Sequence, residues 1–138
     1  MNYQLIRYSP GLGGYLAEFR PGPDDGRRWC EDSLYMDGDV FEALVFIVGP
    51  FSMKRPVTVS GEALTKLADE VEHAACQVSQ AETPKAIWPY SAGYGYTQFN
   101  SVRDWAAERQ DLTRLLRALG AWVDEVGEAG KPLTIRHG

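Results

Sequence analysis

The chain has 138 residues, of which 44% are hydrophobic and 24% are charged, and its formal net charge is −5. These values are typical of a single folded domain over residues 1–138 and exclude an intrinsically disordered chain. The acidic balance argues against a protein that coats nucleic acid, because neutralising phosphates requires clustered Lys and Arg. A basic protein partner is easier to accommodate.

The longest uninterrupted apolar run, residues 43–48, is much shorter than a membrane helix requires, so we expect no membrane partner. Residues 1–7 lack a basic region followed by a long apolar segment. No secretory signal is therefore predicted, and a cytoplasmic location is expected. The two cysteines, Cys30 and Cys76, are too few for a disulfide framework, and we expect both to be free thiols.

The first third of the chain has the composition of β-structure. Residues 3–8 and 14–20 are rich in aromatic and branched side chains, and the breaker segment 9–14 between them predicts a hairpin. Residues 29–36 supply a candidate third strand, which a turn at residues 37–38 would end.

Residues 39–48 are compatible with either a helix or a strand. Their branched and aromatic side chains favour a strand, whereas Asp39 and Glu42 have the spacing of a helix capping box. Apolar side chains occur on every side, so we expect the segment to be buried in either case and to end at residues 49–50.

Two later segments have the apolar periodicity of amphipathic helices. The first follows an extended piece at residues 56–59 and is predicted to be capped by Ser60. The second starts near Ser101 and continues for about six turns, until glycines and a proline stop it. The apolar stripes of the two helices are Leu64, Leu67, Ala68, Val71, Ala75 and Val78, and Trp105, Leu112, Leu115, Leu116, Leu119, Trp122, Val123 and Val126.

Residues 133–136 have the pattern of a short final strand, which we expect to join the N-terminal sheet. The predicted fold class is therefore α+β. An N-terminal antiparallel sheet, joined by the C-terminal strand, would be packed by two or three helices.

Two patterns resemble catalytic or ligand sites only in part. Asp69, His73 and Cys76 share the polar side of one helix, but nucleophilic catalysis and zinc binding need groups that converge from other elements. Residues 11–14 are glycine-rich and follow a strand, yet no helix or Lys–Ser/Thr pair follows, so a turn is expected. The sequence predicts no catalytic residue, no metal site and no cofactor.

Residues 88–99 hold aromatic side chains among Pro, Ser and Gly. Some of these rings are expected to pack over the core. Tyr90, Tyr94 and Tyr96 are candidate partner-binding residues, because tyrosine in such a setting is typical of protein-binding loops. The alternative is a pocket beneath this loop, in which these tyrosines and His73 are the polar groups of a small enzyme or a small-molecule-binding domain.

Acidic side chains gather in the loops between residues 24 and 42, with only Arg27 and Arg28 among them. Most such clusters are simply solvated, but an acidic patch can steer a basic protein into place. The candidate partner-binding acids are Asp24, Asp25, Glu31, Asp32 and Asp37. We expect them to raise an association rate, while aromatic anchors such as Tyr94 or Tyr96 would slow dissociation.

Four short motifs follow one another in the later part of the chain. They are Asp39-Val40-Phe41-Glu42-Ala43-Leu44, Val59-Ser60-Gly61-Glu62-Ala63-Leu64, Asp111-Leu112 with Leu115, Leu116 and Trp122, and Leu133-Thr134-Ile135. From about Tyr35 onward, this order resembles a group of small bacterial proteins of the toxin-immunity type. The resemblance implies that residues 40–48 are helical. It also implies a non-enzymatic protein that binds and neutralises a cognate bacterial toxin.

Overall fold

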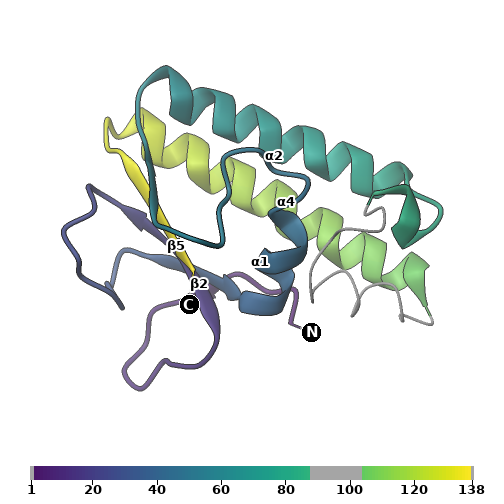
Figure 1. Cartoon of the computed structure of the whole chain (residues 1–138), viewed down its shortest axis with the longest axis horizontal. Helices are drawn as coiled ribbons and strands as arrows, with labels where there is room; N and C mark the ends of the chain where they lie inside the picture. Colours follow the sequence, from purple (N-terminus) through teal and green to yellow (C-terminus); the bar gives the residue numbers. More distant parts are fainter. Residues whose placement is uncertain (1, 88–103, 138) are drawn as a thin grey trace.

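A computed structural model describes residues 2–87 and 104–137. The elements in chain order are β1 (Ile6–Arg7), β2 (Leu16–Pro21), β3 (Leu34–Asp37), α1 (Gly38–Leu44), β4 (Val57–Val59), α2 (Glu62–Gln80), the 3-10 helix η1 (Pro84–Ala86), α4 (Trp105–Glu128) and β5 (Leu133–His137). The predicted α+β class is confirmed. Figure 1 shows α2 and α4 side by side over the sheet, with α1 beside them.

The strands form one antiparallel sheet in the order β1-β3-β2-β5-β4. The last strand, β5, lies between β2 and β4. Its residue Ile135 pairs with Phe19 of β2 on one side and with Val57 of β4 on the other. The prediction that the final strand joins the N-terminal sheet is therefore confirmed, and the extended piece at residues 56–59 supplies the edge strand.

The predicted N-terminal hairpin is wrong in its pairing. β1 pairs with β3 rather than with β2, and the segment between β1 and β2 forms a loop in which Gly11 and Gly14 have φ values of 85° and 108°. Glycine adopts these positive φ values without strain, so the chain can follow a wider loop here instead of a tight hairpin turn. The third strand is also shorter than predicted, because Ser33 donates to the Cys30 carbonyl in a turn and β3 starts only at Leu34.

The ambiguous segment after β3 is helical at its start. The Asp37 carboxylate accepts hydrogen bonds from the backbone of Asp39 at 2.8 Å and of Val40 at 3.3 Å, and so caps α1. Of the two alternatives for this segment the helix is observed at its start, capped by Asp37 rather than Asp39, and residues 37–38 pass from β3 directly into α1 instead of forming a separate turn. α1 ends at Leu44, before the residue 48 limit implied by the resemblance, and Phe46 is 48% exposed rather than buried.

Both amphipathic helices are confirmed, but their starts differ from the predictions. Gly61, with φ 57°, occupies the N-cap position of α2 instead of Ser60. α4 begins at Trp105 rather than near Ser101, and the Asp104 carboxylate caps its first turn. All residues of the two predicted apolar stripes are buried.

The two long helices pack antiparallel, since the contacts between them run in opposite directions along the chain. A Cβ at Gly120 would lie 3.6 Å from Val71, and one at Gly127 would lie 3.5 Å from Leu64. At the other end, the Trp105 indole donates a hydrogen bond to the Ala81 carbonyl at 2.8 Å. The buried faces of the helices and of the sheet form one hydrophobic cluster.

The cysteines and the lengths of the helices also bear on the sequence predictions. Cys30 and Cys76 are free thiols, as predicted. No helix in the described part of the chain is long and apolar enough to cross a membrane.

Candidate binding surface on the outer face of the sheet

The side chains of β2 and β5 alternate between the two faces of the sheet. Ala17, Phe19 and Ile135 are buried in the core beneath the helices. Glu18 lies opposite Arg136, and both point to the other face, which we call the outer face. Next to them on the outer face lie the polar side chains of Arg20 and Thr134, whereas Ala17, Phe19 and Ile135 make the inner face apolar at this place.

The connection between β2 and β3, residues 22–33, folds back over the outer face, and we call it the strap. Two arginines of the sheet hold it by ion pairs, Arg20 with Asp25 and Arg136 with Asp24. A second nitrogen of Arg20 donates to the Asp25 carboxylate at 2.7 Å. The hydrogen bond from Arg20 and one from the backbone of Arg27 hold the pKa of Asp25 well below its usual range. The strap therefore stays ion-paired at neutral pH.

A buried carboxylate holds the far end of the strap. Glu18, only 5% exposed, accepts a hydrogen bond from the Cys30 backbone at 3.2 Å and one from the Tyr35 hydroxyl at 2.9 Å. Burial and the neighbouring Glu18 raise the pKa of Tyr35 above its usual value, so the hydroxyl stays protonated and keeps donating. A buried carboxylate needs such donors, because burying an unpaired charge is costly.

Trp29 is the exposed aromatic side chain of the strap. Its ring stacks on Tyr35, with the ring centroids 5.5 Å apart and the planes at 21°. It is 38% exposed, and its φ of 61° is the one positive value of a non-glycine residue in the described chain. A bulky residue in this left-handed region is strained by about 1 to 3 kcal/mol. The surrounding contacts therefore fix the ring in place while leaving part of it open to solvent.

The structure separates the predicted acidic residues into three roles. Asp24 and Asp25 are ion-paired to arginines of the sheet, as described above. Glu31 and Asp32 are exposed on the strap and form no ion pair with another described residue. Asp37 caps α1 and also accepts a hydrogen bond from the Asn2 backbone at 3.3 Å.

Other predicted site residues lie elsewhere. Tyr90, Tyr94 and Tyr96, with the rest of residues 88–99, are outside the described residues. Asp69, His73 and Cys76 are exposed on α2. Within residues 2–87 and 104–137, no group of three His, Cys, Asp or Glu side chains is arranged to hold a metal ion.

The sequence analysis missed Glu18, Trp29 and the two arginines that hold the strap. One signal was present: Glu18 stands between the buried residues Ala17 and Phe19, where a charged side chain needs partners on the opposite face. The strap pairs could not be found in this way, because Asp24 and Arg136 are 112 positions apart.

No protein-family model, curated protein or solved structure matches this chain. Assignment of a function therefore depends on its own residues.

Proposed function

We propose that this chain is a non-enzymatic binding protein of the toxin-immunity type, which binds and neutralises a cognate bacterial toxin through the strap. The observation that carries the proposal is Trp29, a tryptophan with a strained backbone whose partly exposed ring stacks on Tyr35. Backbone strain at an exposed position tends to occur at functional sites.

The physical case for an interface begins with the ring itself. Tryptophan is enriched among the residues that contribute most to protein–protein affinity, because it buries a large area with little loss of side-chain freedom. Stacking on Tyr35 orders Trp29 before binding, so the ordering cost is already met in the free protein. Both features favour slow dissociation of a partner.

Charged side chains surround this aromatic centre. Arg27, Arg28, Glu31 and Asp32 are exposed on the strap, on either side of Trp29 in the chain. An apolar centre with a charged rim is the usual arrangement of a protein interface. Asp24 and Asp25 support this surface by holding the strap, and Glu31 and Asp32 are the carboxylates that remain to attract a basic partner.

The experiment uses co-expression with the product of a toxin gene that lies directly upstream of the gene for this chain. The chain is expected to co-purify with the toxin and to restore growth. Trp29→Ala should weaken the complex by at least about 30-fold, as expected for an interface anchor. A neighbouring gene product that shows no toxicity when this chain is deleted would contradict the proposal.

Phe46→Ala is the matched control variant. Phe46 is 48% exposed, but it lies away from the strap, in a hollow with Gln77 and Gln80 of α2. It should bind the toxin like the wild type. Equal loss of binding in both variants would show that the strap is not the interface, and unfolding curves of each variant would exclude loss of the fold.

A further inference from the structure

A second surface feature lies where β5 ends, and it involves cations rather than aromatic rings. A hollow of about 170 Å³ opens there, and we call it the β5-end hollow. Its lining residues are Arg28, Met53, Lys54, Arg55, Pro56, Arg136 and His137. They come from the strap, from the segment before β4 and from β5, so the fold brings together residues that are far apart in the chain.

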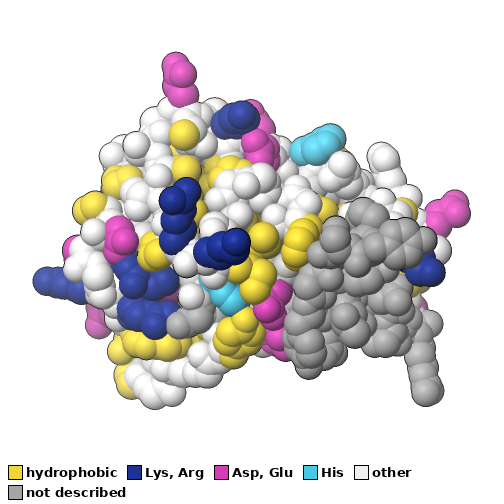
Figure 2. Space-filling view, in the orientation of Figure 1, with side chains coloured by type: hydrophobic (Ala, Val, Ile, Leu, Met, Phe, Trp, Pro, Cys, Tyr) yellow, Lys and Arg dark blue, Asp and Glu magenta, His cyan; other side chains and the backbone are white. Residues whose placement is uncertain are grey.

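The positive charge of this hollow is largely uncompensated. Arg28, Lys54 and Arg55 are exposed, and none forms an ion pair with another described residue. Arg136 is paired with Asp24. In a chain of net charge −5, this concentration of cations opposes the overall balance. Figure 2 shows Lys and Arg side chains gathered beside a histidine on this face, below the long helices.

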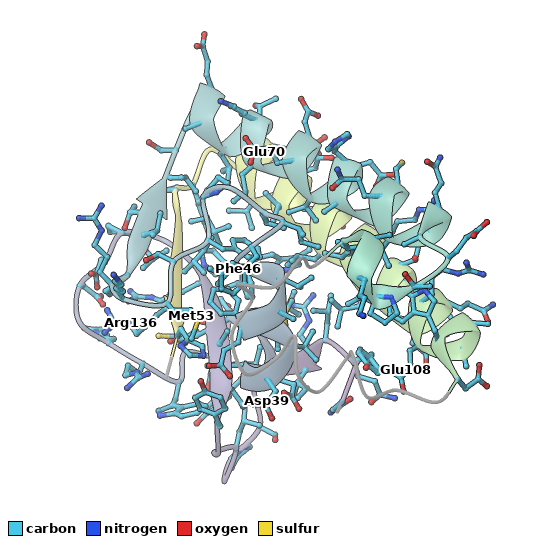
Figure 3. The ribbon with its side chains drawn as sticks, turned by 45° about the vertical axis from the view of Figure 1, so that its right-hand side comes forward. Asp39, Phe46, Met53, Glu70, Glu108 and Arg136 are labelled. Atoms are coloured by element: carbon cyan, nitrogen blue, oxygen red, sulfur yellow. The ribbon has the colours of Figure 1, made fainter. Side chains whose placement is uncertain are left out.

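Two of the lining residues, Arg136 and His137, are held in place by their neighbours. Asp24 holds Arg136, whose side chain is only 19% exposed. The His137 ring stacks on Phe41 at 5.2 Å and meets the edge of Tyr15 at 5.0 Å. Figure 3 shows Arg136 and Met53 on the same side of the molecule. Fixed side chains beside long, exposed cations suit the capture of a small anion.

The geometry points to the β5-end hollow as a binding site for the phosphate group of a small phosphate-bearing molecule. Three unpaired cations exceed what one carboxylate can neutralise, whereas a phosphate monoester carries a charge of about −1.5 to −2 at neutral pH. Guanidinium groups also match phosphate oxygens in pairs of parallel hydrogen bonds. The site is a single hollow rather than a track of cations, which suits one phosphate group better than a nucleic-acid backbone.

The apolar part of the lining suggests where the rest of such a molecule would lie. Met53 is 36% exposed, and Pro56 is exposed beside it in the same hollow. An organic portion attached to the phosphate could cover these two side chains. This site shares Arg28 with the proposed interface, but it does not require a protein partner, and its test involves no toxin.

The test is a titration of the whole chain with inorganic phosphate and, separately, with adenosine monophosphate. Sodium chloride keeps the ionic strength constant, because screening alone changes exposed charges. The chain has two histidines, and their ring signals in NMR spectra are the readout. His137 lines the hollow, whereas His73 is exposed on α2 and serves as the internal control. We expect saturable shifts for His137 and none for His73.

A double variant, Lys54→Gln with Arg55→Gln, should weaken binding by at least about tenfold, since it removes two charge-assisted contacts. Arg7→Gln with Lys131→Gln is the matched control, because it removes the same charges from exposed positions outside the hollow. That control should bind like the wild type. Unfolding midpoints of both double variants would establish that each is folded.

The two titrations distinguish between the possible ligands of the hollow. Tighter binding of adenosine monophosphate than of inorganic phosphate would identify an organic phosphate as the ligand, and equal binding would identify free phosphate. Shifts that do not saturate, that appear equally at His73, or that persist unchanged in the Lys54/Arg55 variant would overturn the site.

Discussion

Trp29 combines a left-handed backbone with a large ring stacked on a buried neighbour, Tyr35. In this region a side chain with a Cβ is strained by about 1 to 2 kcal/mol, whereas glycine is not. Stacking on Tyr35 and the two ion pairs of the strap stabilise the conformation against that strain. The strain itself is therefore measurable by substitution.

We expect Trp29→Gly to be more stable than Trp29→Ala by about 1 kcal/mol, because both variants lose the ring but only alanine keeps the strain. Chemical denaturation of the two variants gives this difference in free energy of unfolding directly. The control is the single substitution Ala63→Gly, at an exposed position of α2, which should be less stable than the wild type, since glycine destabilises a helix relative to alanine. Equal stability of the two Trp29 variants would contradict the strained conformation.

His137 also has a measurable consequence at the scale of one residue. Burial lowers its pKa below the ordinary value of 6.5, although a hydrogen bond with the Gly38 backbone and the nearby charge of Asp39 act in the opposite direction. Its Nε2 atom is buried without a hydrogen-bond partner among the described residues. His137 therefore binds a proton less readily in the folded chain than in the unfolded chain.

As the pH falls from the ordinary histidine pKa towards the lower folded value, unfolded His137 binds more protons than folded His137. The free energy of unfolding should therefore be fully retained above about pH 6.5 and decrease below it. His137→Phe should lack this component, because phenylalanine can pack between Phe41 and Tyr15 but cannot titrate. Parallel pH profiles for wild type and variant would refute the assignment.

At the scale of elements, α4 carries the longest buried face. Leu116 and Leu119 are fully buried in it, and α2 packs alongside. Leu116→Ala or Leu119→Ala should lower the free energy of unfolding by about 2 to 5 kcal/mol, since each leaves a cavity in the core. Ala121→Gly, at an exposed position of the same helix, should cost only about 1 kcal/mol. Unchanged denaturation midpoints in both leucine variants would contradict the packing of α4.

The elements differ in how far the sequence could predict them. α2 and α4 were predictable because their apolar stripes repeat over many turns, and each turn adds to the same signal. The pairing of β1 was not predictable, because a strand of two residues is too short to show which residues of another strand it would face. Its partner, β3, also comes later in the chain, after β2 and the whole strap. α1 was ambiguous, since its cap is the last residue of β3 and both states use similar side chains.

The candidate site was predictable only in part. The acidic residues of the strap could be named from the sequence, but their division into ion-paired and unpaired groups depends on Arg20 and Arg136. These arginines come from two different strands, and their positions follow from the sheet register rather than from local pattern. The strain at Trp29 likewise arises from the fold around it.

At the scale of the whole molecule, charge should act on binding in two ways, through the exposed carboxylates of the strap and through the ion pairs that hold it. Glu31→Gln with Asp32→Asn should lower the association rate with a basic toxin at low salt and leave the dissociation rate nearly unchanged. Asp24→Asn should act differently, because it frees Arg136 and loosens the strap, and so should raise the dissociation rate. Stopped-flow binding at two salt concentrations separates these effects. Identical kinetics in the two variants would contradict the division of roles.

The place of β5 in the sheet has a consequence for biosynthesis. Thr134 of β5 donates a hydrogen bond to the carbonyl of Gly22, which follows β2, although the two residues lie 112 positions apart in the chain. While the ribosome is still translating α4, β2 has no neighbour on one side, and its unpaired backbone is open to pairing with other chains. Such late, long-range closure slows folding. A nascent chain stalled just before Leu133 should therefore be more prone to aggregate, and to recruit chaperones, than one released after His137.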